Sequence, residues 1–307
     1  MSTPGPDPKV TVLLSIPFMI IGFLLSRAPY NMTSVPPTKP WADGPLKLIT
    51  TPQYQTKRTD VFTTGATHMA LLHNSILRGF NSIYLQAPLI LEQDKADFIG
   101  YCLAWYKFVK SHHDDEEQTL FNKIEEVLQD KTIFAETHKE HESFLPGLAK
   151  FESYLTSVQT NPSSFDGEEL VRIMSTFQAD FEHHFHSEVA TIAAFADHPN
   201  APKPDTPENE AATTTFKTWG KSTVTKAGVM DVVPLFLMNL DKTVEEGMWT
   251  NWPPMPGPIR WGLVNLAGAV HYGWWKFASC DSNGKPQELW AYRAQEIKAQ
   301  REGAGKT

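Results

Sequence analysis

Histidine is concentrated in four short stretches of this chain. Nine of the eleven histidines fall in clusters that begin at residues 68, 112, 138 and 183, and each cluster lies in a segment with a helical pattern. Two clusters contain His-x-x-x-Glu, which places an imidazole and a carboxylate one helical turn apart on the same face. Four helices that each direct such groups inward can enclose a metal site in the core of a bundle.

The fourth cluster contains the most informative acid of the chain. His184 and Glu188 lie in the middle of an apolar stripe on the helical wheel, whereas His183 and His186 point away from it and are predicted to be exposed. A carboxylate on an apolar stripe is costly to bury unless a cation or a hydrogen-bond donor meets it. Glu188 therefore indicates a bound cation.

The second cluster leaves one choice open. Glu116 falls near the centre of its apolar stripe, and His112 and His113 flank the stripe on either side, so that the wheel does not choose between them. Glu116 pairs at i,i+4 with His112, whereas His113 pairs in the same way with Glu117. We therefore favour His112 as the ligand and keep His113 as the alternative.

The first and third clusters each place one histidine on the apolar face. These are His73 and His141; His68 lies to one side of its face, and His138 is one turn earlier than His141 and off-centre. A lone core histidine is most often a hydrogen-bonded structural residue. Four helices that each carry a histidine on the apolar stripe, two of them with a glutamate in register, instead favour a metal site.

The predicted ligands are four imidazoles and two carboxylates: His73, His112, Glu116, His141, His184 and Glu188. Six ligands are too many for one tetrahedral zinc ion, and the set is too rich in nitrogen for calcium or magnesium. Imidazole together with carboxylate suits iron, and two bridging carboxylates suit a pair of ions. We therefore predict a non-heme di-iron centre, with manganese, zinc, mixed metals or a single ion as alternatives.

Helical segments must position these residues. The stretch 61–200 is helical throughout, without a convincing alternating strand, which predicts an all-α domain. A linker rich in proline and threonine precedes it at 29–60, and an extension with seven of the nine tryptophans follows it at 201–307. We expect the extension to pack on the helical domain or to cap its open end, and we interpret its His271 as structural.

The N-terminal segment 1–28 contains an apolar run at residues 10–26, which lies between Lys9 and Arg27. Its length is at the short limit of a membrane-spanning helix, and the basic region and cleavage site of a secretory signal peptide are both poorly represented. We therefore expect membrane attachment through residues 10–26 and favour a membrane-anchored protein over a cytoplasmic one. A signal peptide and a soluble packing segment are the alternatives.

Composition and motifs exclude several classes of function. The net charge of −8 and the lack of a dense Lys/Arg run argue against a nucleic-acid partner. No Ser-His-Asp arrangement, P-loop or dinucleotide fingerprint is present, so hydrolase, kinase and dehydrogenase activities have no support. Cys102 is expected to be a buried thiol, with a disulfide to Cys280 as the alternative.

At these residues the chain resembles the hemerythrin-like (HHE cation-binding) family, in particular its fungal members. The resemblance covers residues 61–196 and is carried by one motif in each helix: His73-Asn-Ser-Ile-Leu-Arg-Gly-Phe, His112-His-Asp-Asp-Glu-Glu-Gln, His141-Glu-Ser-Phe-Leu-Pro-Gly-Leu and His184-Phe-His-Ser-Glu. It implies an up-down-up-down four-helix bundle around a di-iron site, with the six predicted ligands in place and both glutamates as bridges. It also implies dioxygen or peroxide binding, iron sensing or redox chemistry.

One position departs from the family's pattern. Oxygen-carrying hemerythrins have a fifth histidine one turn from the one in the third helix, at i,i+4, and the residues at these distances from His141 here are Leu145 and Thr137. His138 lies at i,i−3 instead and is kept as an out-of-pattern seventh ligand. This argues against reversible oxygen carriage and favours redox chemistry or sensing at open coordination positions. We expect a protein that binds or senses dioxygen, peroxide or iron. The alternatives are a di-iron oxidase or peroxidase-like enzyme and a membrane-tethered interaction protein with a structural metal site.

Overall fold

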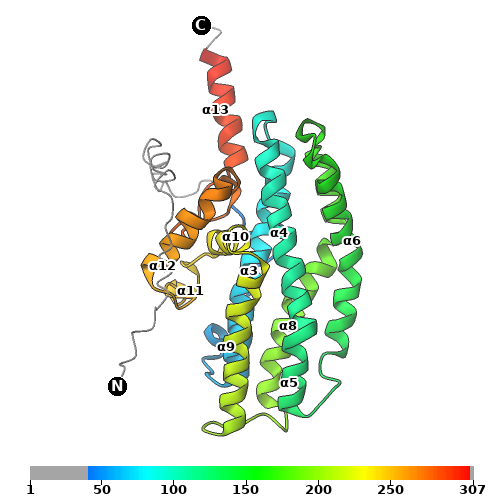
Figure 1. Ribbon diagram of the computed structural model, residues 1–307, viewed down its shortest axis with the longest axis vertical. Coiled ribbons are helices and arrows are strands. Elements are labelled where there is room, and N and C mark those ends of the chain that lie inside the picture. The colour runs from blue at the N-terminus through cyan, green and yellow to red at the C-terminus, as the bar shows by residue number, and fades with distance from the viewer. Residues whose placement is uncertain (1–40, 305–307) are drawn as a thin grey trace, which may run out of the picture. The chain divides into compact units, whose positions relative to one another are not determined.

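The computed structural model describes residues 41–304, and these residues are folded into helices without a named strand (Figure 1). Within this range the strand-like pairing is confined to an isolated β-bridge between Cys280 and Pro286. The predicted all-α class is therefore confirmed for the described part of the chain.

Four long helices surround a common core. They are α3 (Val61–Gln86), α4 (Lys95–Asp115), α6 (Ala135–Gln159) and α8 (Gln178–Ala194). α3 contacts α4 and α8, and α6 contacts the same two helices, so that each of the four lies between two others. Figure 1 shows α4, α6 and α8 side by side.

Shorter elements join and extend these helices. Between residues 52 and 197 the shorter elements are α2 (Pro52–Thr56), η1 (Ala87–Leu89), η2 (Glu92–Asp94), η3 (Glu116–Leu120), α5 (Phe121–Leu128), η4 (Pro162–Ser164), α7 (Gly167–Ser175) and η5 (Phe195–Asp197). The C-terminal extension contributes α9 (Pro207–Ala227), α10 (Val232–Asn239), α11 (Val244–Gly247), α12 (Gly257–Gly262), η6 (Leu263–Ala267), η7 (Gly268–Phe277) and α13 (Trp290–Ala304).

Capping side chains mark where several helices begin. Asp60 accepts a hydrogen bond from the Thr63 backbone N–H at the start of α3, and Thr206 accepts one from the Asn209 N–H at the start of α9. Pro207 occupies the first turn of α9, where its missing N–H costs nothing. These are the residue types that sequence patterns use to predict helix starts.

A π-helical turn interrupts the helix that carries the second histidine cluster. α4 ends at Asp115, η3 is π-helical from Glu116 to Leu120, and α5 continues at once from Phe121. A π turn holds an extra residue and frequently lies at a functional site. Here it begins at Glu116, one of the two buried glutamates of the core.

Trp105 of α4 lies against the backbone of α3. Its fully buried indole donates a hydrogen bond from Nε1 to the Ile76 carbonyl over 2.9 Å. A Cβ atom at Gly79 would lie 2.5 Å from Trp105 Cδ1, so the missing side chain at this position allows the two helices to approach.

We expect Gly79→Ala to lower the free energy of unfolding by about 1–3 kcal/mol, because the buried indole has no room to move away. Gly220→Ala in α9 is the matched control. Nothing lies within 4 Å of its Cβ position, so alanine there should raise stability by up to about 1 kcal/mol. Urea unfolding followed by circular dichroism measures both. Equal effects of the two substitutions would contradict close packing at Gly79.

The C-terminal extension packs against the long helices, which is one of the two arrangements expected for it. α9 contacts α3, α4 and α5, and every residue of α10 is buried where that helix meets α3 and α4. Buried hydrogen bonds add to these contacts: Ser75 donates to the Phe236 carbonyl over 2.9 Å, and the Tyr101 hydroxyl donates to Asn239 Oδ1 over 3.2 Å.

The described part of the predicted linker also lies against α3. Leu46 is fully buried, and its backbone N–H donates to Asn81 Oδ1 over 2.8 Å. The Ile49 N–H donates in the same way to Asn74 Oδ1 over 2.7 Å. Residues 46–49 are therefore held by side chains of the helix that they accompany.

Two further expectations concern the membrane and the cysteines. Among the helices of residues 41–304, none combines the length and the apolar character needed to cross a membrane. The expected anchor at residues 10–26 lies outside the described residues.

Cys102 and Cys280 are both buried and free, so the buried-thiol interpretation of Cys102 is confirmed and the disulfide alternative is wrong.

Candidate metal centre

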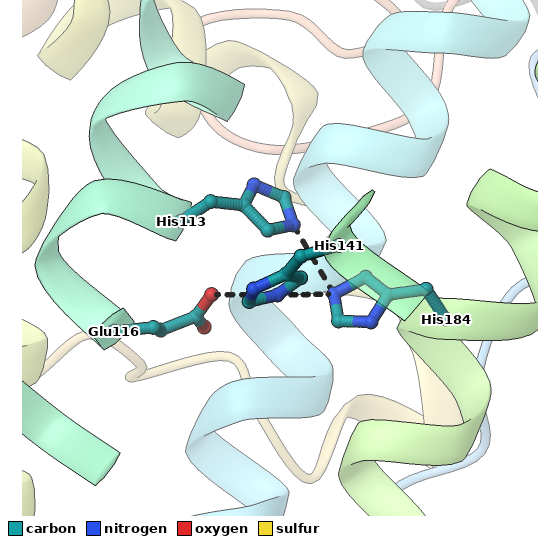
Figure 2. A group of neighbouring side chains, drawn as sticks. All are labelled: His113, Glu116, His141 and His184. Atoms are coloured by element: carbon teal, nitrogen blue, oxygen red, sulfur yellow. Dashed lines mark hydrogen bonds and ion pairs between the residues drawn. The ribbon is translucent and has the colours of Figure 1, made fainter. Parts of the chain in front are cut away.

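Two groups of buried side chains meet in the core between the four long helices, and they have Glu116 in common. The first group, shown in Figure 2, is His113, Glu116, His141 and His184. The second group is His73, His112, Glu116 and Glu188. Within each group the potential ligand atoms all lie within 4.8 Å of one another.

All seven side chains come from segments whose apolar stripes were identified in the sequence. They are His73 of α3, His112 and His113 of α4, Glu116 at the start of η3, His141 of α6, and His184 and Glu188 of α8. The structure thus brings together the six residues predicted from the sequence and adds His113.

His113 and His112 are both buried, so the structure uses both residues between which the helical wheel did not choose. Their rings lie on the two sides of the helix face that carries Glu116, and each ring belongs to a different group. The expectation of one histidine from each helix concealed this arrangement. The signal that reveals it is a pair of adjacent histidines placed on either side of a central buried acid.

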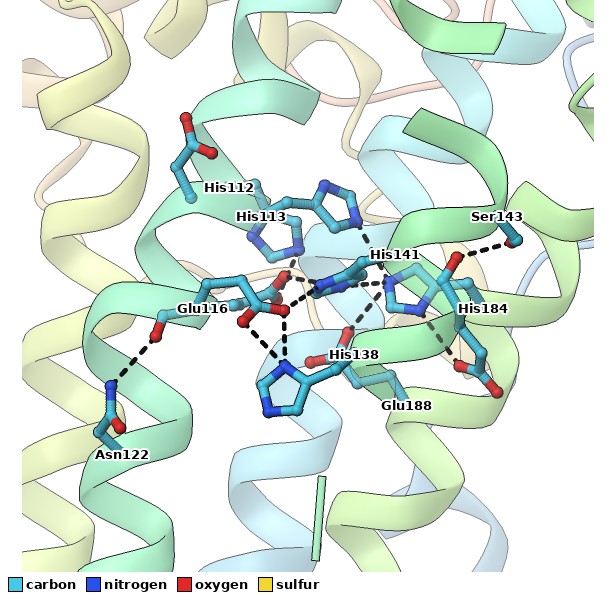
Figure 3. A network of polar contacts seen from close by, with 12 residues as sticks. His112, His113, Glu116, Asn122, His138, His141, Ser143, His184 and Glu188 are labelled. Atoms are coloured by element: carbon cyan, nitrogen blue, oxygen red, sulfur yellow. Dashed lines mark hydrogen bonds and ion pairs between the residues drawn. The ribbon is translucent and has the colours of Figure 1, made fainter. Parts of the chain in front are cut away.

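The Nε2 atoms of the imidazoles point toward one another (Figures 2 and 3). His73 Nε2 lies 2.9 Å from His112 Nε2 in the second group. In the first group, His184 Nε2 lies 3.1 Å from His113 Nε2 and 3.2 Å from His141 Nε2. Two imidazole nitrogens at such distances need a proton or a cation between them.

Backbone carbonyls orient two of the rings. His73 Nδ1–H donates to the Phe185 carbonyl over 3.1 Å, and His113 Nδ1–H donates to the Val109 carbonyl over 2.8 Å. A neutral imidazole carries one proton, so these bonds leave the Nε2 lone pair directed at the centre. This is the support that metal-binding histidines usually receive from their surroundings.

Carboxylates orient two more rings. His141 Nδ1–H donates to Glu117 Oε1 over 2.6 Å, and His184 Nδ1–H donates to Glu140 Oε2 over 3.3 Å. Burial raises the pKa of Glu117, but hydrogen bonds from His141 and His138 outweigh it and hold that pKa below its ordinary value. Glu117 is therefore a carboxylate that can fix the His141 ring.

His138 supports the centre from outside the two groups. Its half-exposed ring holds Glu117 through Nδ1, which lies 2.8 Å from Glu117 Oε2, and Figure 3 shows it beside Glu116 and His141. The off-centre position that the helical wheel assigned to His138 thus corresponds to a contact with Glu117. Two further residues labelled in Figure 3 bond to the backbone of the supporting acids: Asn122 donates to the Glu117 carbonyl, and the Ser143 hydroxyl donates to the Glu140 carbonyl.

The two glutamates at the centre are fully buried, and none of their four oxygens accepts a hydrogen bond. Imidazole nitrogens approach them instead: His112 Nε2 lies 2.9 Å from Glu116 Oε1, and His73 Nε2 lies 3.4 Å from Glu188 Oε2. Burial raises the pKa of both carboxyls well above its ordinary value, and the nearby Glu116 raises that of Glu188 further. A cation at this point would lower both pKa values again, because a nearby positive charge favours the carboxylate form.

Burial also acts on the imidazoles. It lowers the pKa of all five, to about 3 for His112, and neighbouring imidazoles lower it further for His73, His113 and His184. The neutral form that results is the one that binds a metal ion. The imidazole lone pairs therefore converge on carboxylates that accept no hydrogen bond, and together they form a set of ligand atoms that fits cations. The first group supplies three imidazole nitrogens and the second group supplies two.

The two groups differ in their access to solvent. A pocket of about 350 Å³ opens beside the first group and is lined by His113, Asp114, Glu117, His138, His141, Glu142 and Leu145. On the side of the second group, the buried Trp219 of α9 lies over His112, with ring centroids 5.6 Å apart. Small molecules can therefore approach the first group directly, whereas the extension covers the second.

The remaining histidines lie outside the two groups. His183 is exposed, as predicted, whereas His186 is only half-exposed and donates from Nε2 to the Lys47 carbonyl over 2.9 Å. His68 is mostly buried beside Trp252, and His271 stacks on Trp274 with ring centroids 3.7 Å apart. The structural interpretation of His271 agrees with this stacking.

Comparison with known proteins places this arrangement in a family. The model of the hemerythrin HHE cation binding domain matches residues 64–196, which include all seven side chains of the two groups. The dimeric xanthone biosynthesis cluster protein R11 of Cryptosporiopsis sp. (strain 8999) is 31% identical over 266 residues, which cover 84% of this chain and 95% of that protein. No solved structure matches the chain. The chain belongs to the hemerythrin HHE cation-binding domain family, as its histidine motifs implied.

Proposed function

We propose that the protein binds two iron ions, one in each group, with Glu116 as a bridge between them. The observation that carries the proposal is the orientation of this carboxylate. Oε1 lies 2.9 Å from His112 Nε2 of the second group, and Oε2 lies 3.8 Å from His141 Nε2 of the first group. Each oxygen thus faces a different group, which is the geometry that a bridging carboxylate requires.

Glu188 supports a second bridge. Its Oε2 lies 3.4 Å from His73 Nε2 and 3.6 Å from His184 Nε2, and these two imidazoles belong to different groups. The donor set then consists of two carboxylates, both shared, and five imidazoles. Imidazole and carboxylate together suit iron, with manganese or zinc as the alternatives that a metal analysis separates.

We also propose that α3, α4, α6 and α8 have the up-down-up-down topology that the resemblance implies. Each of them contacts two of the others, and only residues 87–94 connect α3 to α4. Short connections favour antiparallel neighbours in helical bundles.

The protein would use this centre to bind or sense dioxygen, peroxide or iron itself. A pair of ferrous ions held by the two groups would supply electrons to dioxygen or peroxide. His113 supports dioxygen binding, because it is a fifth imidazole and its ring centroid lies 4.6 Å from that of His141. Leu145 alone therefore does not argue against oxygen carriage, since the neighbouring helix offers the imidazole that the third helix lacks.

A di-iron oxidase or peroxidase-like enzyme is the second candidate. The pocket of about 350 Å³ favours it, because it leads to His113 and His141 and is large enough for more than a diatomic ligand. The relative named for a dimeric xanthone biosynthesis cluster adds a biosynthetic setting in which a redox step would fit.

Mixing the ferrous-loaded protein with oxygen separates the two candidates. A binding or sensing protein should show an optical change that stops after one equivalent and reverses under vacuum or on reduction. An enzyme should consume oxygen or peroxide continuously in the presence of a reductant. A metal-loaded protein that does neither would show that the centre does not react with dioxygen or peroxide, and dioxygen or peroxide binding and the enzyme proposal would then both be wrong.

Glu117→Gln tests how the protein orients His141. We expect metal affinity at the first group to fall roughly 10- to 100-fold, because the amide holds the His141 Nδ1–H more weakly than the carboxylate does. Competition with a chromophoric chelator measures the affinity. Glu126→Gln on the outer surface of α5 is the matched control and should leave the affinity unchanged. Equal affinities of the two variants would contradict a supporting role of Glu117.

A further inference from the structure

Exposed apolar side chains gather on one stretch of the C-terminal extension. Of the eight large hydrophobic residues that are exposed in the described chain, five lie within 14 residues of α12, η6 and η7, at 54–62% exposure: Ile259, Trp261, Leu266, Val270 and Tyr272. We call these five residues the apolar face. Figure 1 shows α12 at the edge of the ribbon, on the opposite side from α6.

The apolar face is not the side by which this stretch packs on the protein. The buried residues of η6 and η7 are Val264, Gly268, Trp275 and Phe277, and Gly268 lies against Pro234 of α10. Ile259 of α12, Leu266 of the π-helical η6 and Val270 of the 3-10 helical η7 remain open to solvent. The stretch therefore has two apolar sides, and α10 covers only one of them.

The apolar face also lacks free charge. From Gly247 to Cys280 the chain has no aspartate or glutamate, although its net charge is −8. The two cations of the stretch are engaged elsewhere: Arg260 donates to the Leu237 carbonyl over 3.1 Å, and Lys276 pairs with Asp94 and Asp97. The Asp97 carboxylate of α4 lies against Gly273 beside the face and is paired with Lys276. The face itself consists of hydrocarbon and aromatic rings.

Large exposed apolar surfaces mark protein or membrane contacts, and the residue types here favour a membrane. Trp and Tyr concentrate where hydrocarbon meets lipid headgroups, because their rings are apolar and carry one polar atom. Trp261 and Tyr272 accompany the aliphatic residues of the face in this way. The apolar run at residues 10–26 gives the same chain a second segment of a kind that lipid accommodates, and stable membrane attachment commonly needs two such signals.

We propose that the apolar face docks on a lipid bilayer, with Ile259, Leu266 and Val270 in the interface and Trp261 and Tyr272 at the level of the headgroups. The occupant is the membrane surface rather than a second copy of the chain. Because Lys276 is paired with Asp94 and Asp97 and the mostly buried Arg260 guanidinium is directed at the Leu237 carbonyl, apolar insertion rather than charge attraction drives the contact. Binding should therefore occur on neutral phosphatidylcholine vesicles and depend weakly on salt.

A fluorophore at position 266 tests the proposal in the full-length chain. Cys102 and Cys280 are fully buried, so a thiol-reactive, polarity-sensitive dye will label Leu266→Cys selectively. Phosphatidylcholine vesicles should raise the emission roughly two- to fivefold and shift it to the blue, as on transfer from water to an interface. Ser153→Cys, exposed on α6, is the matched control and should report no change.

Three outcomes would overturn the proposal. If the protein sediments with vesicles but the dye at position 266 stays in water, attachment does not involve the apolar face. If the dye is shielded before lipid is added and becomes exposed on dilution, a second copy covers the face. If it is shielded at every protein concentration without lipid, another part of the same chain covers it.

Discussion

Glu116→Gln is expected to weaken metal binding in both groups, lowering the metal content from about two ions per chain to less than about one. The reason is that Glu116 is common to the two groups and turns one oxygen toward each of them. The amide has nearly the same shape as the carboxylate but lacks its charge and its second acceptor oxygen. Loss of outer partners alone typically costs roughly 10- to 100-fold in affinity, so loss of a shared ligand should cost more at each position.

Elemental analysis after reconstitution with ferrous iron under nitrogen measures this effect. Glu142→Gln is the matched control, because Glu142 is an exposed glutamate on the wall of the pocket that belongs to neither group. It should keep the metal content of the unchanged protein. A Glu116→Gln protein that still holds two ions would contradict the bridging role of this residue.

Removal of the metal is expected to lower the melting temperature by roughly 10 °C or more at neutral pH. Ions that bind only the folded chain stabilise it, each by about 2.7 kcal/mol when the free metal is at 100 times its dissociation constant. For a domain of this size, each kcal/mol corresponds to about 2–4 °C. Without the ions, the converging lone pairs of five imidazoles and the two buried carboxyls lose the partner that satisfies them.

The metal-free protein should also become less stable as the pH falls below about 6.5. Burial lowers the pKa of the five imidazoles, so the unfolded chain binds protons that the folded chain excludes, and stability is lost toward acid. Glu116 and Glu188 act in the opposite sense. Their raised pKa values make the folded state bind more protons, so their contribution is lost as the pH rises. Five imidazoles outweigh two carboxyls, and the net effect is acid destabilisation.

Calorimetry of the chelated and iron-loaded proteins between about pH 5 and pH 8 checks both parts of this prediction. At neutral pH the chelated protein should melt at a lower temperature than the iron-loaded protein. The chelated protein should also lose stability steadily below about pH 6.5. Protein with His183→Gln, altered at an exposed histidine outside both groups, serves as the control and should show the same profile. A melting temperature that does not change on chelation would show that no structurally coupled ion was bound.

Local patterns in the sequence are sufficient to predict the helices and most of the centre. Apolar periodicity places His73, His141, His184 and Glu188 on buried faces, because a helix that packs by one stripe leaves little doubt about which residues the stripe contains. The structure finds all four buried there. The all-α class follows from the same periodicity and from the lack of convincing alternating strands.

Contacts between helices are what the periodicity does not predict. Glu117 holds both His138 and His141, and Glu140 holds His184, through pairs that are 21 to 44 residues apart in the chain. In the sequence, Glu117 is only the i,i+4 partner of His113, and nothing local indicates that it contacts the third helix. The cover that Trp219 forms over His112 depends in the same way on how α9 packs, which no local pattern encodes.

The metal content of the full-length protein, reconstituted under nitrogen with ferrous iron and freed of excess metal, tests the central claim most directly. The shared Glu116 and the two groups around it predict about two iron ions per chain, with an absorption band of oxidised iron after exposure to air. Stoichiometric zinc that iron does not replace, or an iron content that saturates at about one ion per chain, would contradict a di-iron centre.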